Sequence, residues 1–162
     1  MIIVEGMDNT GKSTLIEVLG KEFKIPAARS NMAGAKMDQM VRWINWAGAC
    51  PKSLILDRHP AISDLVYGNI IRGSSESSVE FAQKSRKGNF LIYCCPSLRS
   101  IEESFLDRPQ MKGTHENLLA LYTAYESLME KLSPDFYYDW RNPKHLSALI
   151  HQLNSPVFTM NV

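Results

Sequence analysis

The sequence has little of what would place the protein in a specialised class. Its three cysteines, Cys50, Cys94 and Cys95, have neither disulfide nor zinc-ligand spacing, so we expect three reduced thiols. The net charge of +1 at pH 7 gives no strong field for holding nucleic acid or an acidic membrane. No apolar run approaches the roughly 18 residues that a membrane span needs. Residues 1–5 already have a strand pattern, so we expect no targeting leader and a cytoplasmic protein.

The composition is that of an ordinary globular domain. Of the 162 residues, 44% are hydrophobic and 22% are charged, and a chain of this length builds a core without covalent staples. The low-complexity segment at residues 73–78 is too short for an interdomain linker. We therefore expect a single domain over residues 1–162.

Short apolar runs alternate with segments of helical periodicity. Strands are predicted at residues 2–4, 25–29, 53–56, 90–94 and 136–140, and helices at residues 12–23, 35–48, 61–71, 79–86, 97–106, 115–132 and 143–153. This alternation is typical of βαβ units. The sequence predicts an α/β three-layer sandwich, with a parallel central sheet of about five strands and helices on both faces. Such sheets bind ligands at the carboxyl ends of their strands.

A phosphate-binding loop is predicted at residues 6–13, which match the whole G-x4-G-K-[ST] pattern between a predicted strand and a predicted helix. Gly6 and Gly11 let the backbone wrap closely around phosphate, and N–H groups at the helix start supply partial positive charge. Lys12 is expected to reach the β- and γ-phosphates of ATP, and the Ser13 hydroxyl to bind Mg²⁺. The expected ATP-binding residues are Gly6, Asp8, Asn9, Thr10, Gly11, Lys12, Ser13 and Thr14.

A second charged motif, Asp57-Arg58-His59, follows the predicted strand at residues 53–56. If that strand lies beside the first, Asp57 and Arg58 emerge at the sheet edge that carries the phosphate loop. The carboxylate is then placed to order Mg²⁺, and the guanidinium to bind an acceptor phosphate bidentately. A surface ion pair is the alternative interpretation. His59 is expected at most to donate a hydrogen bond.

These motifs resemble those of the thymidylate kinases, members of the nucleoside monophosphate kinase group. The similarity rests on VEGMDNTGKSTL at residues 4–15 and LDRH at residues 56–59, with Ser63, Tyr67 and Gly68 downstream. It implies phosphoryl transfer from ATP, with Mg²⁺, to a deoxynucleoside 5′-monophosphate, and it favours dTMP as the acceptor. It also implies a homodimer, although the sequence offers no interface signature.

The resemblance implies roles for individual residues. Asp8 would approach the acceptor 3′-hydroxyl and favour deoxyribose, and Arg58 would bind the acceptor phosphate. The acceptor-binding residues expected on this basis are Asp8, Arg29, Arg42, Trp43, Arg58 and Tyr67. The expected metal-binding residues are Ser13 and Asp57, and the expected catalytic residues are Lys12, Asp57, Arg58 and Arg108. Packing in the core is the alternative for Trp43 and Tyr67.

The sequence departs from this family in the phosphate loop and in the lid. Eukaryotic members place an arginine directly after the loop carboxylate, where this chain has Asn9. Some bacterial members supply a lid cation instead, and the lid expected here, residues 107–114, is short. Arg108 is its first candidate for the transition-state cation and Lys112 its second. The short chain suggests a trimmed, viral version working in the host cytoplasm, and the departures leave the acceptor base open.

Other functions remain open on the sequence alone. A deoxynucleoside kinase needs a carboxylate base, which Asp57 would supply, although related nucleoside kinases usually have Glu-Arg-Ser there. A nucleotide-binding switch or adaptor would keep the loop without this activity, but a GTPase would need an Asn-Lys-x-Asp motif that the sequence lacks. A DNA-end kinase is disfavoured by the near-neutral charge. We expect ATP and a deoxynucleoside monophosphate as partners, with no stable nucleic acid and no membrane.

Overall fold

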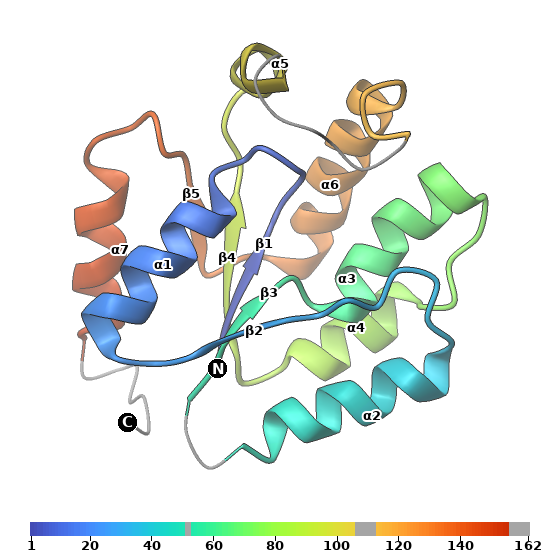
Figure 1. Ribbon diagram of the computed structural model, residues 1–162, viewed down its shortest axis with the longest axis horizontal. Helices are drawn as coiled ribbons and strands as arrows, with labels where there is room; N and C mark the ends of the chain where they lie inside the picture. Colours follow the sequence, from blue (N-terminus) through green and yellow to red (C-terminus); the bar gives the residue numbers. More distant parts are fainter. Residues whose placement is uncertain (51–52, 106–112, 156–162) are drawn as a thin grey trace.

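A five-stranded parallel sheet forms the middle of three layers in the computed structural model, which describes residues 1–50, 53–105 and 113–155 (Figure 1). The strands are β1 (Ile2–Glu5), β2 (Ala27–Arg29), β3 (Ile55–Asp57), β4 (Phe90–Cys94) and β5 (Phe136–Tyr138). Their order is β2-β3-β1-β4-β5, and every neighbouring pair is parallel. The predicted fold class is confirmed.

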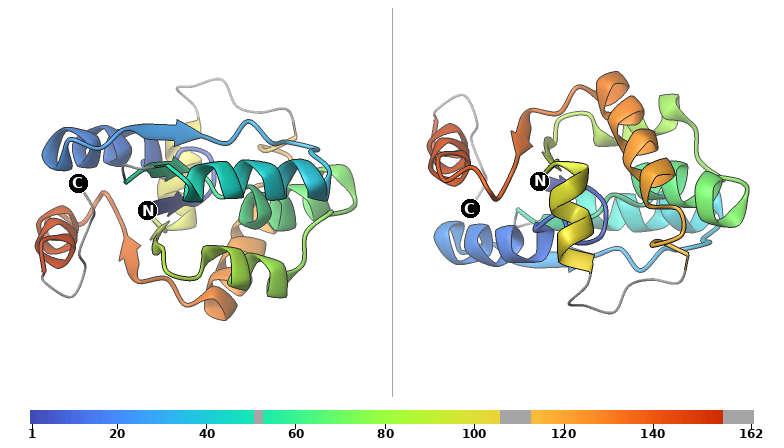
Figure 2. Two further views of the ribbon diagram at one scale, coloured as in Figure 1. Left: turned by 90° about the horizontal axis from the view of Figure 1, so that it is seen from below. Right: turned by 90° about the horizontal axis from the view of Figure 1, so that it is seen from above.

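Helices cover both faces of the sheet. They are α1 (Lys12–Phe23), α2 (Met37–Gly48), α3 (Pro60–Ser63), the π-helix η1 (Asp64–Arg72), α4 (Val79–Arg86), α5 (Leu98–Phe105), α6 (Leu118–Leu132) and α7 (His145–Leu153). Apolar residues of α1 and α7 pack on one face of the sheet, and those of α2, α3, α4 and α6 on the other (Figure 2). The neighbouring inner strands β1 and β4 are buried throughout, as expected for apolar strands covered on two sides. No helix within the described ranges is long and apolar enough to cross a membrane.

The register of the sheet brings the two charged motifs together. Val4 of β1 pairs with Asp57 of β3, so the phosphate loop after β1 and Arg58 after β3 leave the sheet at the same edge. Helix α5 lies beyond this edge in Figure 1, and Asn9 of the loop donates a hydrogen bond of 3.3 Å to the Ser104 carbonyl. The two motifs therefore meet where parallel strands end, the edge at which such sheets bind ligands.

The predicted helix at residues 61–71 differs from the structure in its hydrogen bonding. It begins as the short α3, with Pro60 in the first turn, and continues as the nine-residue π-helix η1. Its end is set by Gly73, whose φ of 78° is left-handed. Side-chain periodicity does not separate α- from π-hydrogen bonding over two turns, and π-segments are frequent at functional sites.

Candidate functional site

The phosphate loop runs from the end of β1 into α1 and is shaped by two close approaches. A Cβ atom added to Gly6, whose φ is 141°, would lie 2.6 Å from the Cys94 carbonyl oxygen. Gly11, the N-cap of α1 with φ 85°, packs against the Trp140 ring, and an added Cβ would lie 2.9 Å from it. Only glycine fits both the conformation and the space at these positions. The N–H groups at the start of α1 are thereby presented at the mouth of the loop.

Lys12 lies buried inside this loop. Its Nζ donates hydrogen bonds to the Met7 carbonyl and, at 3.4 Å, to Thr10 Oγ1. Burial, together with the smaller effect of the nearby Arg58 charge, lowers the pKa of Lys12 to about 8. Carboxylates at Asp8 and Asp57 act in the opposite direction. An anionic ligand would favour the charged form of Lys12 and repay its desolvation.

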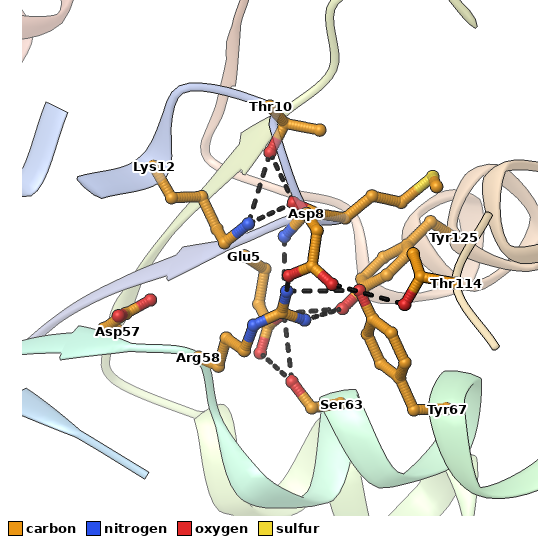
Figure 3. Close-up of polar contacts among 12 residues, drawn as sticks. Glu5, Asp8, Thr10, Lys12, Asp57, Arg58, Ser63, Tyr67, Thr114 and Tyr125 are labelled. Carbon is orange, nitrogen blue, oxygen red and sulfur yellow. Dashed lines mark hydrogen bonds and ion pairs between the residues drawn. The ribbon is translucent and has the colours of Figure 1, made fainter. Parts of the chain in front are cut away.

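Arg58 is the centre of the polar network in Figure 3. Its Nη2 lies 2.6 Å from Asp8 Oδ1 and 3.1 Å from the Tyr67 hydroxyl, and its Nη1 donates to the Tyr125 hydroxyl at 3.0 Å. The guanidinium carbon also stands 4.8 Å from the centre of the Tyr67 ring. Contacts from the loop, from η1 and from α6 therefore fix one cation in one position.

Glu5, at the end of β1, anchors this network to the sheet. It is fully buried, and it accepts hydrogen bonds from the backbone N–H of His59, from the Tyr125 hydroxyl at 3.3 Å and from the Ser63 hydroxyl at 3.4 Å. Burial raises the pKa of Glu5 to about 7, against the lowering effect of Arg58. Glu5 thus ties the end of β1 to the turn that carries Arg58 and to α6.

The backbone at Arg58 is itself unusual. Its φ of 71° is left-handed, which is rare for a residue with a side chain. Two hydrogen bonds hold it there: its N–H donates to the Val4 carbonyl at 3.1 Å, and its carbonyl accepts from the Ser30 hydroxyl at 3.1 Å. Sparsely populated conformations of this kind gather at functional sites.

One cavity of about 470 Å³ connects these groups. Three ion pairs stand in its wall, Arg58 with Asp8, Arg29 with Asp57 at 3.5 Å, and Arg72 with Asp64. Lys12 is a fourth cation there, and within the described residues no carboxylate forms an ion pair with it. The positive charge in excess favours an anionic ligand.

Most of the predicted site residues line this cavity. They are Asp8, Asn9, Gly11, Lys12, Ser13, Thr14, Arg29, Asp57, Arg58 and Tyr67. Gly6 and Thr10 shape the loop without lining the cavity, and Thr10 donates to the Met7 carbonyl at 2.9 Å.

Arg42 and Trp43 are not brought into this cavity. They line a more open hollow with residues 31–35 and Gln39, and Arg42 forms an ion pair of 2.9 Å with Asp38. Residues 31–33 border both hollows. The roles of Arg42 and Trp43 in acceptor binding therefore stay predictions.

The predicted lid falls largely outside the described residues. Arg108 and Lys112 both lie in the undescribed stretch, so their roles stay predictions as well. From the end of the predicted lid, Thr114 is buried and its hydroxyl lies 3.5 Å from Asp8 Oδ2. The chain that follows the lid therefore returns to the phosphate loop.

The predicted Mg²⁺ ligands have suitable chemistry. Ser13 offers a hydroxyl and Asp57 a carboxylate on the wall of the same cavity. Mg²⁺ prefers such hard oxygen ligands and usually takes one or two from protein and the rest from phosphate and water. This donor set fits Mg²⁺ held mainly by a nucleotide.

Several residues of the site were not predicted from sequence. Tyr125 lies on the apolar stripe of α6, where packing in the core was expected, and its hydroxyl instead joins Arg58 to Glu5. Asp64 and Arg72 also line the cavity, and no motif contains them. His59, expected at most to donate a hydrogen bond, donates through its backbone, while both ring nitrogens are buried without a partner among the described residues.

The fold and the loop define a P-loop kinase-like fold. No protein-family model matches the chain, and no curated protein matches it. Among solved structures, YorR protein from Bacillus subtilis in complex with phosphorylated GDP is similar, with a TM-score of 0.77 and 20% identity over 94% of each chain.

Deoxyadenosine kinase from M. mycoides is also similar in two solved structures. The form with dCMP and a flexible dCDP has a TM-score of 0.67 and 13% identity, over 94% of this chain and 97% of that one. The form with bound dCTP has a TM-score of 0.62 and 14% identity, over 95% and 99%. At these identities the likeness establishes the fold, while the reaction has to be argued from the site.

Proposed function

We propose that the protein transfers the γ-phosphoryl group of ATP to the 5′-phosphate of a deoxynucleoside monophosphate, with dTMP as the favoured acceptor. One observation carries the proposal: the same cavity contains Lys12 from a complete phosphate loop and a rigidly held Arg58 from the neighbouring strand end. Two fixed cations in one cavity suit two phosphate groups that must meet in line.

The division of labour follows from where each cation sits. Lys12 and the N–H groups of the loop bind the β- and γ-phosphates of the donor. Arg58 holds the acceptor phosphate, whose oxygen is already an anion, so the reaction needs no strong general base. Ser13 and Asp57 would hold Mg²⁺, which would neutralise charge on the donor phosphates. Catalysis then consists of positioning and of neutralising the charge that grows during transfer.

The remaining predicted residues complete this scheme. Asp8 orients Arg58 and approaches the acceptor sugar, which favours deoxyribose, and Tyr67 packs beside both. Arg29 and Asp57 form an ion pair at the same edge of the cavity. Arg108 is proposed as the lid cation of the transition state. Closure of the lid would exclude water and suppress hydrolysis of ATP.

A deoxynucleoside kinase is the second candidate, because deoxyadenosine kinase from M. mycoides has a similar fold. Its acceptor is a neutral hydroxyl that needs a carboxylate base within reach. Asp57 lines the cavity but forms an ion pair with Arg29, and Glu5 is fully buried behind Arg58. These contacts favour the monophosphate as acceptor.

A phosphotransfer assay read by chromatography tests the proposal. ATP and Mg²⁺ are incubated with dTMP, dUMP, dCMP, dGMP, dAMP, their ribose forms and free thymidine. A diphosphate product from a deoxynucleoside monophosphate supports the proposal, and product from thymidine alone supports the second candidate. Loss of turnover in Lys12→Ala at unchanged melting temperature assigns the product to this chain, whereas an adaptor would bind ATP without forming any product.

A further inference from the structure

We propose that Arg72, held by Asp64, reads a keto group on the acceptor base, so that the site takes thymine or guanine and rejects adenine and cytosine. The inference rests on the proposed function, because it assigns the base of that same acceptor. Arg72 and Asp64 stand in the wall of the cavity that also contains Arg58 and Tyr67. No role in the proposed transfer uses them.

The π-helix brings Arg72 and Tyr67 to the wall of the same cavity. Tyr67 and Arg72 are five residues apart in η1, whose hydrogen bonds join residues five apart, so they lie about one turn from each other. The Tyr67 hydroxyl contacts Arg58, which is assigned to the acceptor phosphate. A group one turn further along the same wall is suitably placed for the base.

Asp64 is held by the protein and buried away from a ligand. One carboxylate oxygen accepts from Arg72, and the other accepts from the Ser75 hydroxyl at 2.7 Å and from the backbone N–H groups of Glu76 at 2.8 Å and Ser77 at 3.1 Å. Three of the four donors share the two lone pairs of Oδ2, and Oδ1 keeps one lone pair beside Arg72, but the side chain is only 3% exposed. This acid is therefore closed to the amino group of adenine or cytosine.

Arg72 has donors to spare. The guanidinium carries five N–H groups and no acceptor, and Asp64 is its one polar partner among the described residues. Its side chain is 31% exposed, whereas that of Asp64 is 3% exposed. The keto oxygen of thymine and the paired O6 and N7 of guanine accept hydrogen bonds from the guanidinium. An amino group at the same place is itself a donor and cannot accept from the guanidinium N–H groups.

Gly68 makes room for this arrangement. A Cβ atom added there would lie 3.0 Å from Arg72 Nη2, 3.1 Å from Asp64 Oδ1 and 2.8 Å from the Ser74 carbonyl oxygen. The guanidinium therefore lies against Gly68, where a larger side chain would collide with it. Lys36 forms an ion pair with Glu76, which ties the loop that caps Asp64 to the chain before α2.

The first test measures kcat/KM of the unmodified protein for dTMP, dGMP, dCMP and dAMP at saturating ATP. We expect dTMP or dGMP to exceed both amino-base substrates by about 10- to 100-fold, the usual discrimination of one well-placed arginine. Equal turnover of all four overturns the inference and leaves the proposed function standing. Turnover of none refutes the proposed function and the inference with it.

The second test removes the donors. Arg72→Gln should lower kcat/KM for the keto substrates until the preference falls below about threefold, leaving the amino-base substrates and the KM for ATP unchanged. Arg86→Gln is the matched control, because Arg86 also forms an ion pair, with Asp135 at 3.1 Å, and does not line the cavity. An equal loss on all four acceptors would assign Arg72 to the phosphate or to the fold, and the inference would fail.

Discussion

The Arg58 guanidinium lies 2.6 Å from the Asp8 carboxylate and thereby joins two motifs that are 50 residues apart in the chain. The pair is mostly buried, with 12% and 24% of the two side chains exposed. An acceptor phosphate that binds Arg58 must share the guanidinium with Asp8. The ion pair therefore couples the phosphate loop to the acceptor subsite.

Replacing Arg58 should separate acceptor binding from donor binding. Arg58→Ala is expected to raise the acceptor KM and lower kcat, with a combined loss of about 100-fold or more, because a charge-neutralising cation is removed. The affinity for ATP should stay within about threefold of the original, since Lys12 and the loop are intact. Steady-state kinetics and calorimetric titration with ATP measure the two effects. An unchanged acceptor KM would contradict the role of Arg58.

Asp8 should control the choice between deoxyribose and ribose. Asp8→Asn retains the size of the side chain and some hydrogen bonding to Arg58 but loses the charge. We expect discrimination between dTMP and its ribose form to fall by about tenfold, because the carboxylate is assigned to the sugar. The ratio of the two kcat/KM values is the measurement. If both values fall by the same factor, Asp8 acts only by holding Arg58.

The Tyr125 hydroxyl should stabilise the site rather than take part in the reaction. Tyr125→Phe removes the bridge between Arg58 and Glu5 and should cost about 1–3 kcal/mol of unfolding free energy, because both partners are buried and charged or polar. The acceptor KM should rise severalfold. Tyr122→Phe is the control on the same helix, since its hydroxyl lies outside this network. Equal melting temperatures for the two variants would exclude the structural role.

Glu5 and His59 should make opposite contributions to stability as the pH changes. Burial lowers the pKa of His59 from 6.5 to about 4, so the unfolded chain binds the extra proton and stability from this group rises with pH through that window. The gain is about 3 kcal/mol. Burial raises the pKa of Glu5 from 4.5 to about 7, so here the folded chain binds the extra proton and stability falls as pH rises.

Two variants should reveal this cancellation. In Glu5→Gln the unfolding free energy should increase more steeply between pH 4.5 and 6.5 than in the unmodified protein. In His59→Phe it should increase less, and the variant should be no less stable at pH 5, because neither buried ring nitrogen has a partner among the described residues. Urea denaturation at the two pH values measures both slopes. Parallel slopes in all three proteins would show that neither group titrates in this range.

Much of the fold followed from the sequence because its signals are local. The spacing of Leu15, Ile16 and Leu19 defines α1, and the β-branched run at residues 2–4 defines β1. The phosphate loop was predictable for the same reason, since one contiguous motif must match one conformation. The strand predicted at residues 53–56 starts two residues before β3, which begins at Ile55.

The rest of the site depends on contacts between distant segments. Tyr125 contacts Arg58, which is 67 residues away in the sequence. The sequence pattern of a tyrosine on an apolar stripe is the same whether or not its hydroxyl has a hydrogen-bond partner. Arg72 and Asp64 face the cavity because η1 is wound as a π-helix, which residue types do not specify. Trp43 shows the converse, because a plausible aromatic in the right region lines a neighbouring hollow instead.

The left-handed backbone at Arg58 sets a limit on how this protein can be made more robust. A residue with a side chain in that conformation costs the folded state about 1–3 kcal/mol, and glycine would remove most of that strain. Arg58→Gly would also leave the Asp8 and Glu5 carboxylates without their cation, a loss of about 3–5 kcal/mol that exceeds the strain relieved. Exchange of a left-handed residue for glycine, a common route to higher stability, is therefore closed at this position, and gains in thermal tolerance have to come from other residues.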